Sequence, residues 1–524
     1  MDWRFPYRSM RVPVMAANCV ATGQPLAAQA GLAMLARGGS AVDAAVAAAI
    51  ALTVLEPCMN GVGSDAFAIV ADGETLHGLN ASGRSPAGLE VERFAGRSTM
   101  PATGWDSVTI PGAVSAWVAL HHRFGRLPFA ALFEPAIGYA RDGFAVTPAI
   151  SALWQAQVPV LGGFADFAET FMTEGRAPLP GERFRCPDQA ATLEEIASSG
   201  GETFYRGRLA EVIARTAQEA DAALSLEDLA AHRPDWVAPL SVGFRGYRVH
   251  ELPPNGQGLA ALIALGILDR LGIDQLDPDG DEIHHLEIEA TKLGMADVRG
   301  HVADPAAMLI RAEELLAPDY LDRRAALVDR RKAMAPTPGK PREHGTVYLA
   351  AADAGGMMVS YIQSNYRGFG SGIVIPGTGI ALNNRGSCFV LDPAHPNRVG
   401  PGKRPLNTII PALATEAGHP VAAFGVMGGT MQPQGHVQVA TRLFARGQNP
   451  QAAIDAPRWR VEAGEVMIEK EWPADFRDKL AARGHRLREA GPLDFGAAQI
   501  IHRLADGGYV AASESRRDGQ AVGF

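Results

Sequence analysis

Near the start of the chain, apolar residues recur in the pattern of two successive helices. The first, PLAAQAGLAMLARGG (25–39), begins with proline and ends in two glycines, which is typical of the two ends of a helix. The second, SAVDAAVAAAIALTVLE (40–56), places Ser40 where a helix N-cap is expected. Because most residues of this second helix are small, we expect it to pack closely against another element.

The pattern then changes to that of strands. AFAIVA (66–71) and TLHGLNA (75–81) flank an Asp-Gly turn, which predicts a hairpin. Between residues 113 and 330 the pattern is mainly helical. Examples are AVSAWVALHHRFG (113–125), FAALFEPAIGYARDG (129–143), AATLEEIASSG (190–200) and LAALIALGILDRLG (259–272).

From residue 346 onward, short β-like runs are separated by Gly, Asn and Asp turns. A chain that is mainly helical first and sheet-rich later indicates an α+β layered architecture rather than alternating βαβ units. We find no internal repeat. The expected elements are TVYLAAAD (346–353), MMVSYIQS (357–364), GIVIPGTGIALNN (372–384), PVAAFGVMGG (420–429), a helix over 435–450, and strands near 466–470 and 497–503.

Composition narrows the class of protein. The 524 residues allow two to four domains or one large layered unit. The formal net charge of −9, with no basic stripe, argues against a nucleic-acid partner.

The four cysteines form no C-x-x-C pair and fit a reducing compartment. Residues 1–20 lack the apolar core of a secretory signal, and the most apolar run (41–57) is too short to span a bilayer, so we expect a cytoplasmic protein that does not bind membranes.

The segment GVGSDA (61–66) matches the G-x-G-x-x-A pattern of nucleotide-binding loops. Such a loop must follow a strand and open a helix, but here a helix-like segment precedes it and a strand-like segment follows. We therefore favour a glycine-rich turn that lets backbone pass close by over a dinucleotide site.

Three histidines stand in EIHHLEIEATKLGMADVRGHVADP (282–305): His284, His285 and His301. Adjacent histidines point to different faces of a helix, and no H-E-x-x-H spacing exists. Solvated or hydrogen-bonded helix residues are therefore favoured over a metal site. The absence of a G-x-S-x-G elbow leaves an α/β-hydrolase unsupported.

Glycine-rich stretches mark the second part of the chain: 365–389, 400–413 and 425–435. Two consecutive N–H groups, as at Gly428 and Gly429, are suited to an oxyanion hole. Ordinary tight turns explain the composition equally well.

Several segments, taken together and in order, resemble the γ-glutamyltranspeptidase family of N-terminal-nucleophile hydrolases. The resemblance covers nearly the whole chain and implies an αββα sandwich. No single segment is specific, but the ordered set is. The segments are 25–57, DSVTIPGAVSAWVALHHRFGRLPFAALFEPAIGYARDGF (106–144), TVYLAAADAGGMMVS (346–360), GFGSGIVIPGTGIALNN (368–384), GPGKRPL (400–406) and the Gly-Gly at 428–429.

The family is made as one precursor that cuts itself before a threonine, and the resemblance places that threonine at Thr346, after Gly345. It implies two regions, 1–345 (mainly helical) and 346–524 (sheet-rich), in one interlocked body. A free N-terminal threonine carries its own base, an α-amine with a pKa of about 7.7–8.0. The amine takes the hydroxyl proton, Oγ1 attacks an amide carbonyl, and water or an amine acceptor resolves the acyl-enzyme.

Further roles are implied by the resemblance. Gly428 and Gly429 would supply oxyanion N–H donors, and Ser364 falls where the family has a threonine hydroxyl near the nucleophile. Because the polypeptide supplies nucleophile, base and donors, no metal or organic cofactor is implied.

The chain departs from the glutathione-cleaving members in the donor pocket, where an acid is lost and a cation is gained. A pocket that binds an α-ammonium group would lose its partner, which is costly. Cys388 stands where those members have an aspartate, and Arg385 stands where they have a neighbouring glutamine or glutamate. Tyr366, beside Asn365, replaces an asparagine, and Asn407 and Thr408 replace paired serines. The carboxylate-binding arginine corresponds to Ser82, two positions before Arg84.

We therefore expect an enzyme that hydrolyses a small amide with an anionic acyl group that lacks an α-amine. Arg385 and Arg84 are the candidate carboxylate partners because arginine offers paired donors. Oxamate amidohydrolases and glutaryl- or cephalosporin-acylase-like members fit this description. Glutathione hydrolysis or γ-glutamyl transfer is the alternative within the family, and a non-cleaving binding protein is the alternative outside it. A homodimer of the cleaved heterodimer is a possible assembly, and an inert buried thiol is expected at Cys388.

Overall fold

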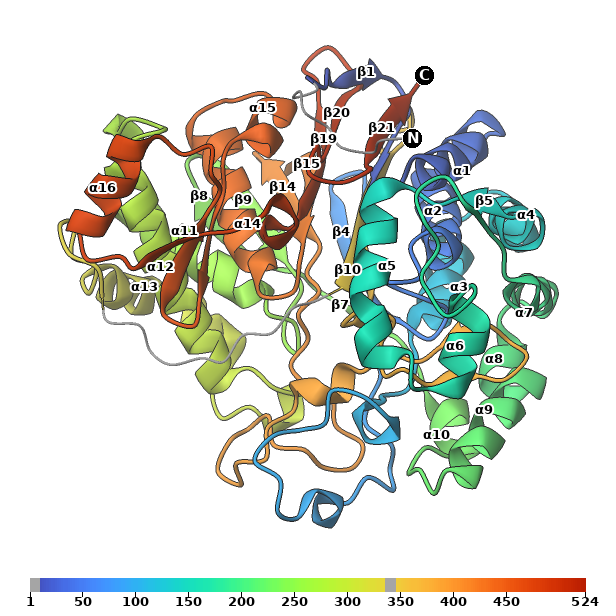
Figure 1. Ribbon diagram of the computed structural model, residues 1–524. Coiled ribbons are helices and arrows are strands. Elements are labelled where there is room, and N and C mark those ends of the chain that lie inside the picture. Colours follow the sequence, from blue (N-terminus) through green and yellow to red (C-terminus); the bar gives the residue numbers. More distant parts are fainter. Residues whose placement is uncertain (1–9, 335–344) are drawn as a thin grey trace.

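The computed structural model describes residues 10–334 and 345–524, and of Gly345 the backbone alone. These residues form two seven-stranded sheets packed face to face, with helices outside each sheet (Figure 1). Part of the N-terminal stretch considered for a signal peptide, and residues 335–344 before the expected cleavage point, lie outside this range.

The first sheet carries the strand that begins near Thr346. All of its neighbouring strands pair antiparallel. Across the sheet the order is β21 (Gln520–Gly523), β2 (Cys19–Thr22), β10 (Gly345–Ala352), β11 (Met358–Tyr366), β3 (Asp65–Asp72), β4 (Thr75–Asn80) and β7 (Asp235–Val237).

The second sheet is also antiparallel throughout. It packs on the first through β10 and β11, which contact β15 and β19. Both sheets combine strands from before and after residue 345. The order in the second sheet is β1 (Val14–Ala16), β20 (Tyr509–Ser513), β19 (Ala497–Arg503), β15 (His419–Met427), β14 (Ala412–Glu416), β9 (Tyr247–Glu251) and β8 (Leu240–Phe244).

Helix α2 (Ala41–Leu55) lies on the first sheet and is buried along its whole length. Ser40 and Asp43 form a capping box that satisfies the first N–H groups of the helix. Small residues let α1 (Pro25–Ala36) approach it closely, since a Cβ on Gly31 would meet the carbonyl oxygen of Ala44 at 2.9 Å. The expected close packing of the alanine-rich helix is confirmed.

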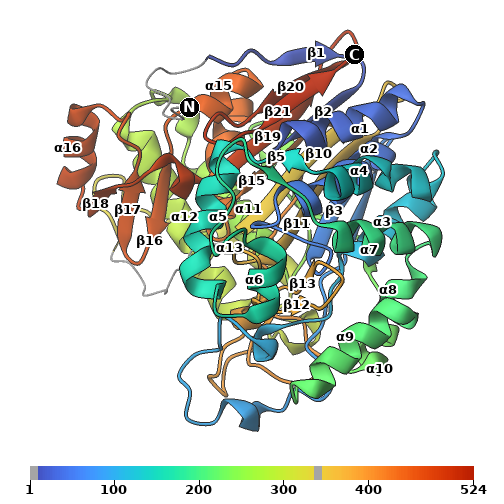
Figure 2. The same ribbon diagram turned by 45° about the vertical axis from the view of Figure 1, so that its right-hand side comes forward.

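Helices α11 (Gly258–Arg270) and α14 (Met431–Ala440) cover the second sheet, and α12 (Asp281–His301) packs against both of them (Figure 2). The helix–sheet–sheet–helix order is the architecture that the family resemblance implied. The other helices are α3 (Ala113–Phe124), α4 (Glu134–Asp142), α5 (Pro148–Leu161), α6 (Ala165–Phe171), α7 (Pro187–Ser198), α8 (Glu202–Arg206), α9 (Arg208–Glu219), α10 (Leu226–Ala231), α13 (Pro318–Ala325), α15 (Pro450–Asp455) and α16 (Ala474–Ala482).

Three smaller sheets complete the described strands. They are β5 (Phe144–Ala145) with β6 (Arg183–Phe184), β12 (Val374–Ile375) with β13 (Ile380–Ala381), and β16 (Trp459–Glu462) with β17 (Glu465–Ile468) and β18 (Leu487–Glu489).

The sequence pattern misplaces some elements. Residues 113–330 are mainly helical, as expected, but they also contribute β7, β8 and β9 to the two large sheets. The expected helix over 435–450 begins at Met431 and ends its α-helical part at Ala440, followed by a π-helical turn over Thr441–Ala445. The helical run at 129–143 opens with a 3₁₀ turn before α4. For β7, β8 and β9, pairing with other strands overrides local periodicity.

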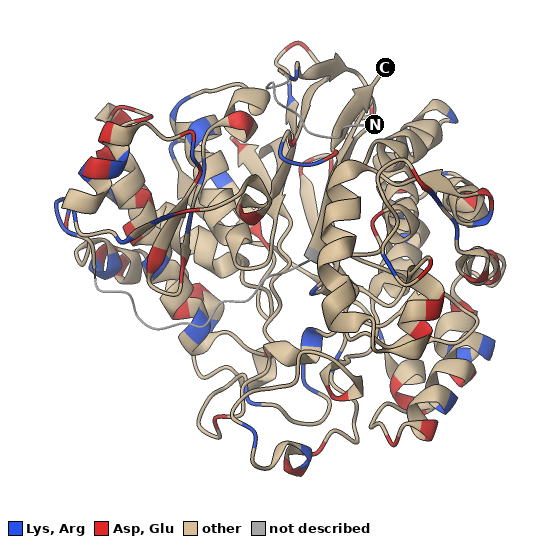
Figure 3. Cartoon of the chain, in the orientation of Figure 1, with Lys and Arg blue, Asp and Glu red and all other residues tan. Residues whose placement is uncertain are grey.

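No helix within residues 10–334 and 345–524 is both long and apolar enough to cross a membrane. Acidic and basic residues alternate along the outer helices α9 and α16, whereas α5 carries no charged residue (Figure 3).

Candidate active site

Thr346 is the second residue of strand β10 and is fully buried. Its Oγ1 lies 3.1 Å from Oγ of Ser364 on the neighbouring strand β11. The pairing of the two strands is irregular here, because Gly345 pairs with Tyr366 while Val347 pairs with Gln363. The additional residue lies on β11, so the strand bulges opposite Thr346, a distortion that re-aims side chains.

Ser364 Oγ is held from a second side. The backbone N–H of Tyr366 donates to it at 2.8 Å. Tyr366 adopts a φ of +80°, which is uncommon for a residue with a side chain and is costly unless its surroundings impose it. The Ser364 hydroxyl is thereby fixed beside the Thr346 hydroxyl.

Two contacts orient β10 against β15 in the facing sheet. Arg503 donates from Nε to the carbonyl oxygen of Pro420 at 3.0 Å and from Nη2 to that of Gly356 at 2.8 Å. These bonds tie the beginning of β15 to the hairpin that follows β10. Farther along, the Tyr348 ring lies against Gly425, where a Cβ would meet it at 2.4 Å. The end of β15 therefore lies beside the first residues of β10.

The loop after β15 contains Gly428 and Gly429, with φ values of +126° and +60°. Both values lie in the region that glycine tolerates best. The N–H groups of these two glycines have no acceptor within hydrogen-bonding distance among the described residues. Gln257 holds the loop, because its Nε2 donates to the carbonyl oxygens of Gly429 and Thr408, both at 2.7 Å. Sequence analysis did not identify Gln257, which carries no motif.

Arg385 is completely buried and pairs with Asp65, the residue of GVGSDA that opens strand β3. Nε donates to Oδ2 of Asp65 at 2.8 Å and Nη2 donates to Oδ1 at 3.1 Å. Asp65 pairs with Ser364 in the β3–β11 register, which puts this ion pair beside the hydroxyl pair. Burial by itself would lower the pKa of Arg385, but Asp65, together with Cys388 and Tyr366, raises the pKa overall.

Asn407 and Thr408 complete the surroundings of this ion pair. Asn407 Nδ2 donates to Oδ2 of Asp65 at 2.7 Å, and Arg385 Nη1 donates to Oγ1 of Thr408 at 2.8 Å. Arg385 thus uses three of its N–H groups and retains one hydrogen on each terminal nitrogen that meets no acceptor among the described residues.

The Tyr366 ring lies between two guanidinium groups, 4.7 Å from that of Arg385 and 4.9 Å from that of Arg367. Burial raises the pKa of its hydroxyl, which accepts a hydrogen bond from Arg367 at 3.1 Å. Cys388 also hydrogen-bonds to Tyr366 and is partly exposed, so the expected burial of this thiol is wrong. Asn365 accepts from Ser64 Oγ at 2.9 Å, and its buried Nδ2 meets no acceptor in the described part of the chain.

Arg84 stands apart from these contacts. Its Nη1 donates to Asp304 at 2.7 Å and to the carbonyl oxygen of Gly402 at 3.1 Å, and 46% of its side chain is exposed. Ser82 is buried in an amide network with Asn80, whose Oδ1 accepts from the serine hydroxyl at 2.7 Å. No described contact joins Arg84 to Thr346 or Arg385.

The GVGSDA segment lies between the end of α2 and the start of β3, the reverse of a dinucleotide-binding turn. A Cβ on Gly63 would meet the carbonyl oxygen of Ala381 at 2.3 Å, so the expected close passage of backbone is confirmed. The unforeseen feature is Asp65, whose partner Arg385 lies 320 positions away in the sequence.

The Gamma-glutamyltranspeptidase family profile matches residues 27–524 of this chain. The chain belongs to the γ-glutamyltranspeptidase family. Three similar proteins illustrate the range of this family. The chain is 36% identical to a glutathione hydrolase-like proenzyme (YwrD) of Bacillus subtilis, covering 95% of this chain and 97% of that one.

It is also 37% identical to an oxamate amidohydrolase proenzyme of Klebsiella pneumoniae, again covering 95% of this chain and 97% of the relative. Among solved structures, a cephalosporin acylase from Bacillus halodurans superposes with a TM-score of 0.96 at 46% identity. The match covers 100% of this chain and 99% of the acylase. The α+β fold expected from the sequence is therefore that of the γ-glutamyltranspeptidase family and its N-terminal-nucleophile relatives.

Proposed function

We propose that this chain is an amide hydrolase that cuts itself between Gly345 and Thr346 and then uses Thr346 as its nucleophile. The observation that carries the proposal is the 3.1 Å contact between the hydroxyls of Thr346 and Ser364, at the start of β10. After cleavage, the new α-amine lies on the same residue as Oγ1 and serves as its base, while the fixed Ser364 hydroxyl orients Oγ1.

The oxyanion formed during attack needs N–H donors that are already in place. Gly428 and Gly429 stand at the end of β15 that faces the start of β10, and their N–H groups meet no acceptor among the described residues. In the proposal these two donors stabilise the negative charge that develops on the carbonyl oxygen. The reaction needs no metal at this site.

We further propose that the acyl group is anionic and lacks an α-amine. The acidic side chain beside Arg385 is Asp65, whose Oδ2 already accepts two hydrogen bonds and whose Oδ1 accepts one, so its negative charge is held by Arg385 rather than offered to an ammonium group. Arg385 retains one hydrogen on each terminal nitrogen, which matches the two oxygens of a substrate carboxylate. The name of the oxamate amidohydrolase relative agrees with such a substrate.

Glutathione hydrolysis remains the second candidate, because the similar Bacillus subtilis protein is named for it. A comparison of turnover with oxamate, a glutaryl amide and a γ-glutamyl anilide separates the two. The proposal expects turnover of one of the first two and little of the third. Efficient turnover of the γ-glutamyl anilide alone would contradict the proposed acyl class, and an active Thr346→Ala variant would contradict the nucleophile.

A further inference from the structure

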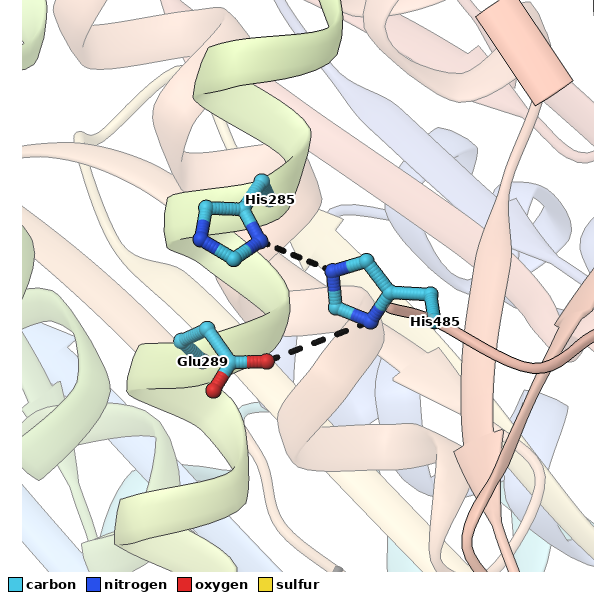
Figure 4. A group of neighbouring side chains, drawn as sticks. All are labelled: His285, Glu289 and His485. Atoms are coloured by element: carbon cyan, nitrogen blue, oxygen red, sulfur yellow. Dashed lines mark hydrogen bonds and ion pairs between the residues drawn. The ribbon is translucent and has the colours of Figure 1, made fainter. Parts of the chain in front are cut away.

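Three potential metal ligands meet inside the protein, away from the candidate active site. His285 and Glu289 stand one helical turn apart on α12, and His485 lies between α16 and β18 (Figure 4). The side chains of His485 and Glu289 are completely buried. Each residue offers one ligand atom within 4.8 Å of the other two.

The hydrogen bonds fix the proton positions in this cluster. Nε2 of His285 lies 2.7 Å from the carbonyl oxygen of Asp329, which only accepts, so that Nε2 carries the proton. Nδ1 of His285 then accepts from Nε2 of His485 at 2.8 Å. Burial lowers the pKa of both histidines, which favours their neutral forms.

The second nitrogen of His485 is left with a lone pair and no donor. Its Nδ1 is buried, meets no hydrogen-bond partner within the described residues, and lies 3.9 Å from Oε1 of Glu289. A lone pair that faces a carboxylate oxygen across a buried gap is unfavourable. A cation in the cluster would remove this conflict.

We propose that His285, Glu289 and His485 bind a divalent transition-metal ion of the zinc class. Two imidazoles and one carboxylate are a ligand set that zinc takes in proteins, and nitrogen ligands disfavour magnesium and calcium. Nδ1 of His285 and Nε2 of His485 already face each other. The proton of His485 moves to Nδ1, so binding releases no proton, and Nδ1 no longer turns a lone pair toward the carboxylate of Glu289.

The outer contacts resemble those that orient metal ligands. His285 donates its other N–H to the carbonyl oxygen of Asp329, as ligating histidines commonly do. Oε2 of Glu289 accepts from the N–H of Met334 at 2.8 Å. The ion would therefore fasten the segment from Asp329 to Met334 onto α12, a structural role rather than a catalytic one.

Lys292 occupies the position of a competing cation. Its Nζ donates to Oε1 of Glu289 at 2.7 Å, and 13% of its side chain is exposed, so the ammonium group lies near a path to solvent. An entering metal ion would displace it from Glu289. Removing the lysine charge should therefore strengthen metal binding, whereas a cluster that binds no metal would show no such gain.

The test uses the full-length protein, stripped with a chelator and titrated separately with Zn²⁺ and Co²⁺. We expect one metal ion per chain by elemental analysis and the visible spectrum of Co²⁺ bound to nitrogen. His485→Gln should weaken binding at least about 100-fold, and Lys292→Met should tighten it about 10-fold. His419→Gln is the matched control, because it removes an exposed His–Glu contact at 3.2 Å.

Failure of the stripped wild type to bind either ion stoichiometrically would overturn the proposal, as would unchanged affinity in His485→Gln. If that variant does not fold, the metal affinity of Lys292→Met is compared with that of wild type. Equal or weaker metal binding by the lysine variant refutes the site. Thr346→Ala should bind the metal as wild type does, which separates this result from the proposed function. His284 and His285 are hydrogen-bonded helix residues, as the sequence predicts, and the proposal adds a metal ion to the partners of His285.

Discussion

Asp65 and Arg385 form a completely buried ion pair with two hydrogen bonds, at 2.8 and 3.1 Å, between strand β3 and the loop after β13. Asp65 stands opposite Ser364, and Ser364 contacts Thr346. The charges of this buried pair therefore affect how firmly Ser364 and Thr346 are held. A substrate carboxylate that binds Arg385 meets a cation already paired with the carboxylate of Asp65, which favours orientation over strong binding.

Removing one partner of this pair should destabilise the protein strongly. Asp65→Asn leaves the guanidinium of Arg385 buried without a counter-charge, and we expect a loss of about 3–5 kcal/mol in the free energy of unfolding. The double variant Asp65→Asn/Arg385→Met should lose less than either single variant, because no buried charge remains. Urea unfolding of Asp65→Asn, Arg385→Met and the double variant measures these losses.

The control for this prediction is Glu134→Gln, which breaks the exposed ion pair with Arg37. That change should cost less than about 1 kcal/mol. A loss of similar size for Asp65→Asn would show that the buried pair does not hold the site together.

Ser364 should act by positioning Thr346 rather than by binding substrate. Ser364→Ala removes the hydroxyl at 3.1 Å from Oγ1, and we expect kcat to fall about 10–100-fold with little change in KM. Ser364→Thr, which restores a hydroxyl, should recover most of the rate. Steady-state kinetics on the best amide substrate check both variants, and a loss confined to KM would refute the positioning role.

The oxyanion donors predict a sharp dependence on Gly428. A Cβ at this position would lie 3.1 Å from Cα of Gly496 and would strain a φ of +126°. Gly428→Ala should therefore shift the N–H donors and lower kcat about 100-fold or more. Gly418→Ala is the matched control, because its φ is +90° but no atom lies within 4 Å of the added Cβ. Equal activity losses in both variants would show that backbone strain alone is responsible.

Glu56 predicts a pH dependence of stability. Burial, with a smaller contribution from the Asp518 charge, raises its pKa from 4.5 to about 8 in the folded protein, against the opposing effect of Arg517. The protonated form therefore favours folding, and this stability is complete below about pH 4.5 and is lost as the pH rises through 8. Glu56→Gln does not titrate and should keep its stability over this range.

Urea unfolding at pH 5, 7 and 9 compares wild type with Glu56→Gln. The free energy of unfolding of wild type should fall relative to the variant by at most about 1.4 kcal/mol per pH unit. Glu169→Gln, at an exposed glutamate, should follow wild type. Parallel curves for wild type and Glu56→Gln would contradict the raised pKa.

Local pattern predicted much of the framework. Ser40 marks the start of α2, as predicted, and the turn at Asp353 falls between β10 and β11. Oδ2 of Asp353 also accepts from the N–H of Ala41 at 2.8 Å. The strands over 235–251 were missed, because short edge and inner strands with mixed burial carry little periodicity of their own.

The parts of the site that depend on distant contacts could not be predicted. The family resemblance pointed to positions 346, 364 and 385, but the anion that neutralises Arg385 lies 320 positions away in a loop that looked like a turn. His285 likewise meets His485 across 200 positions. Such pairs are set by how the sheets and helices pack, which no spacing rule records.

Intact mass spectrometry of the purified protein tests the central claim most directly. The account predicts two polypeptides for wild type, with the smaller one beginning at Thr346, and a single uncut chain without amide turnover for Thr346→Ala. An uncut wild-type chain that still hydrolyses an amide would contradict Thr346 as the nucleophile.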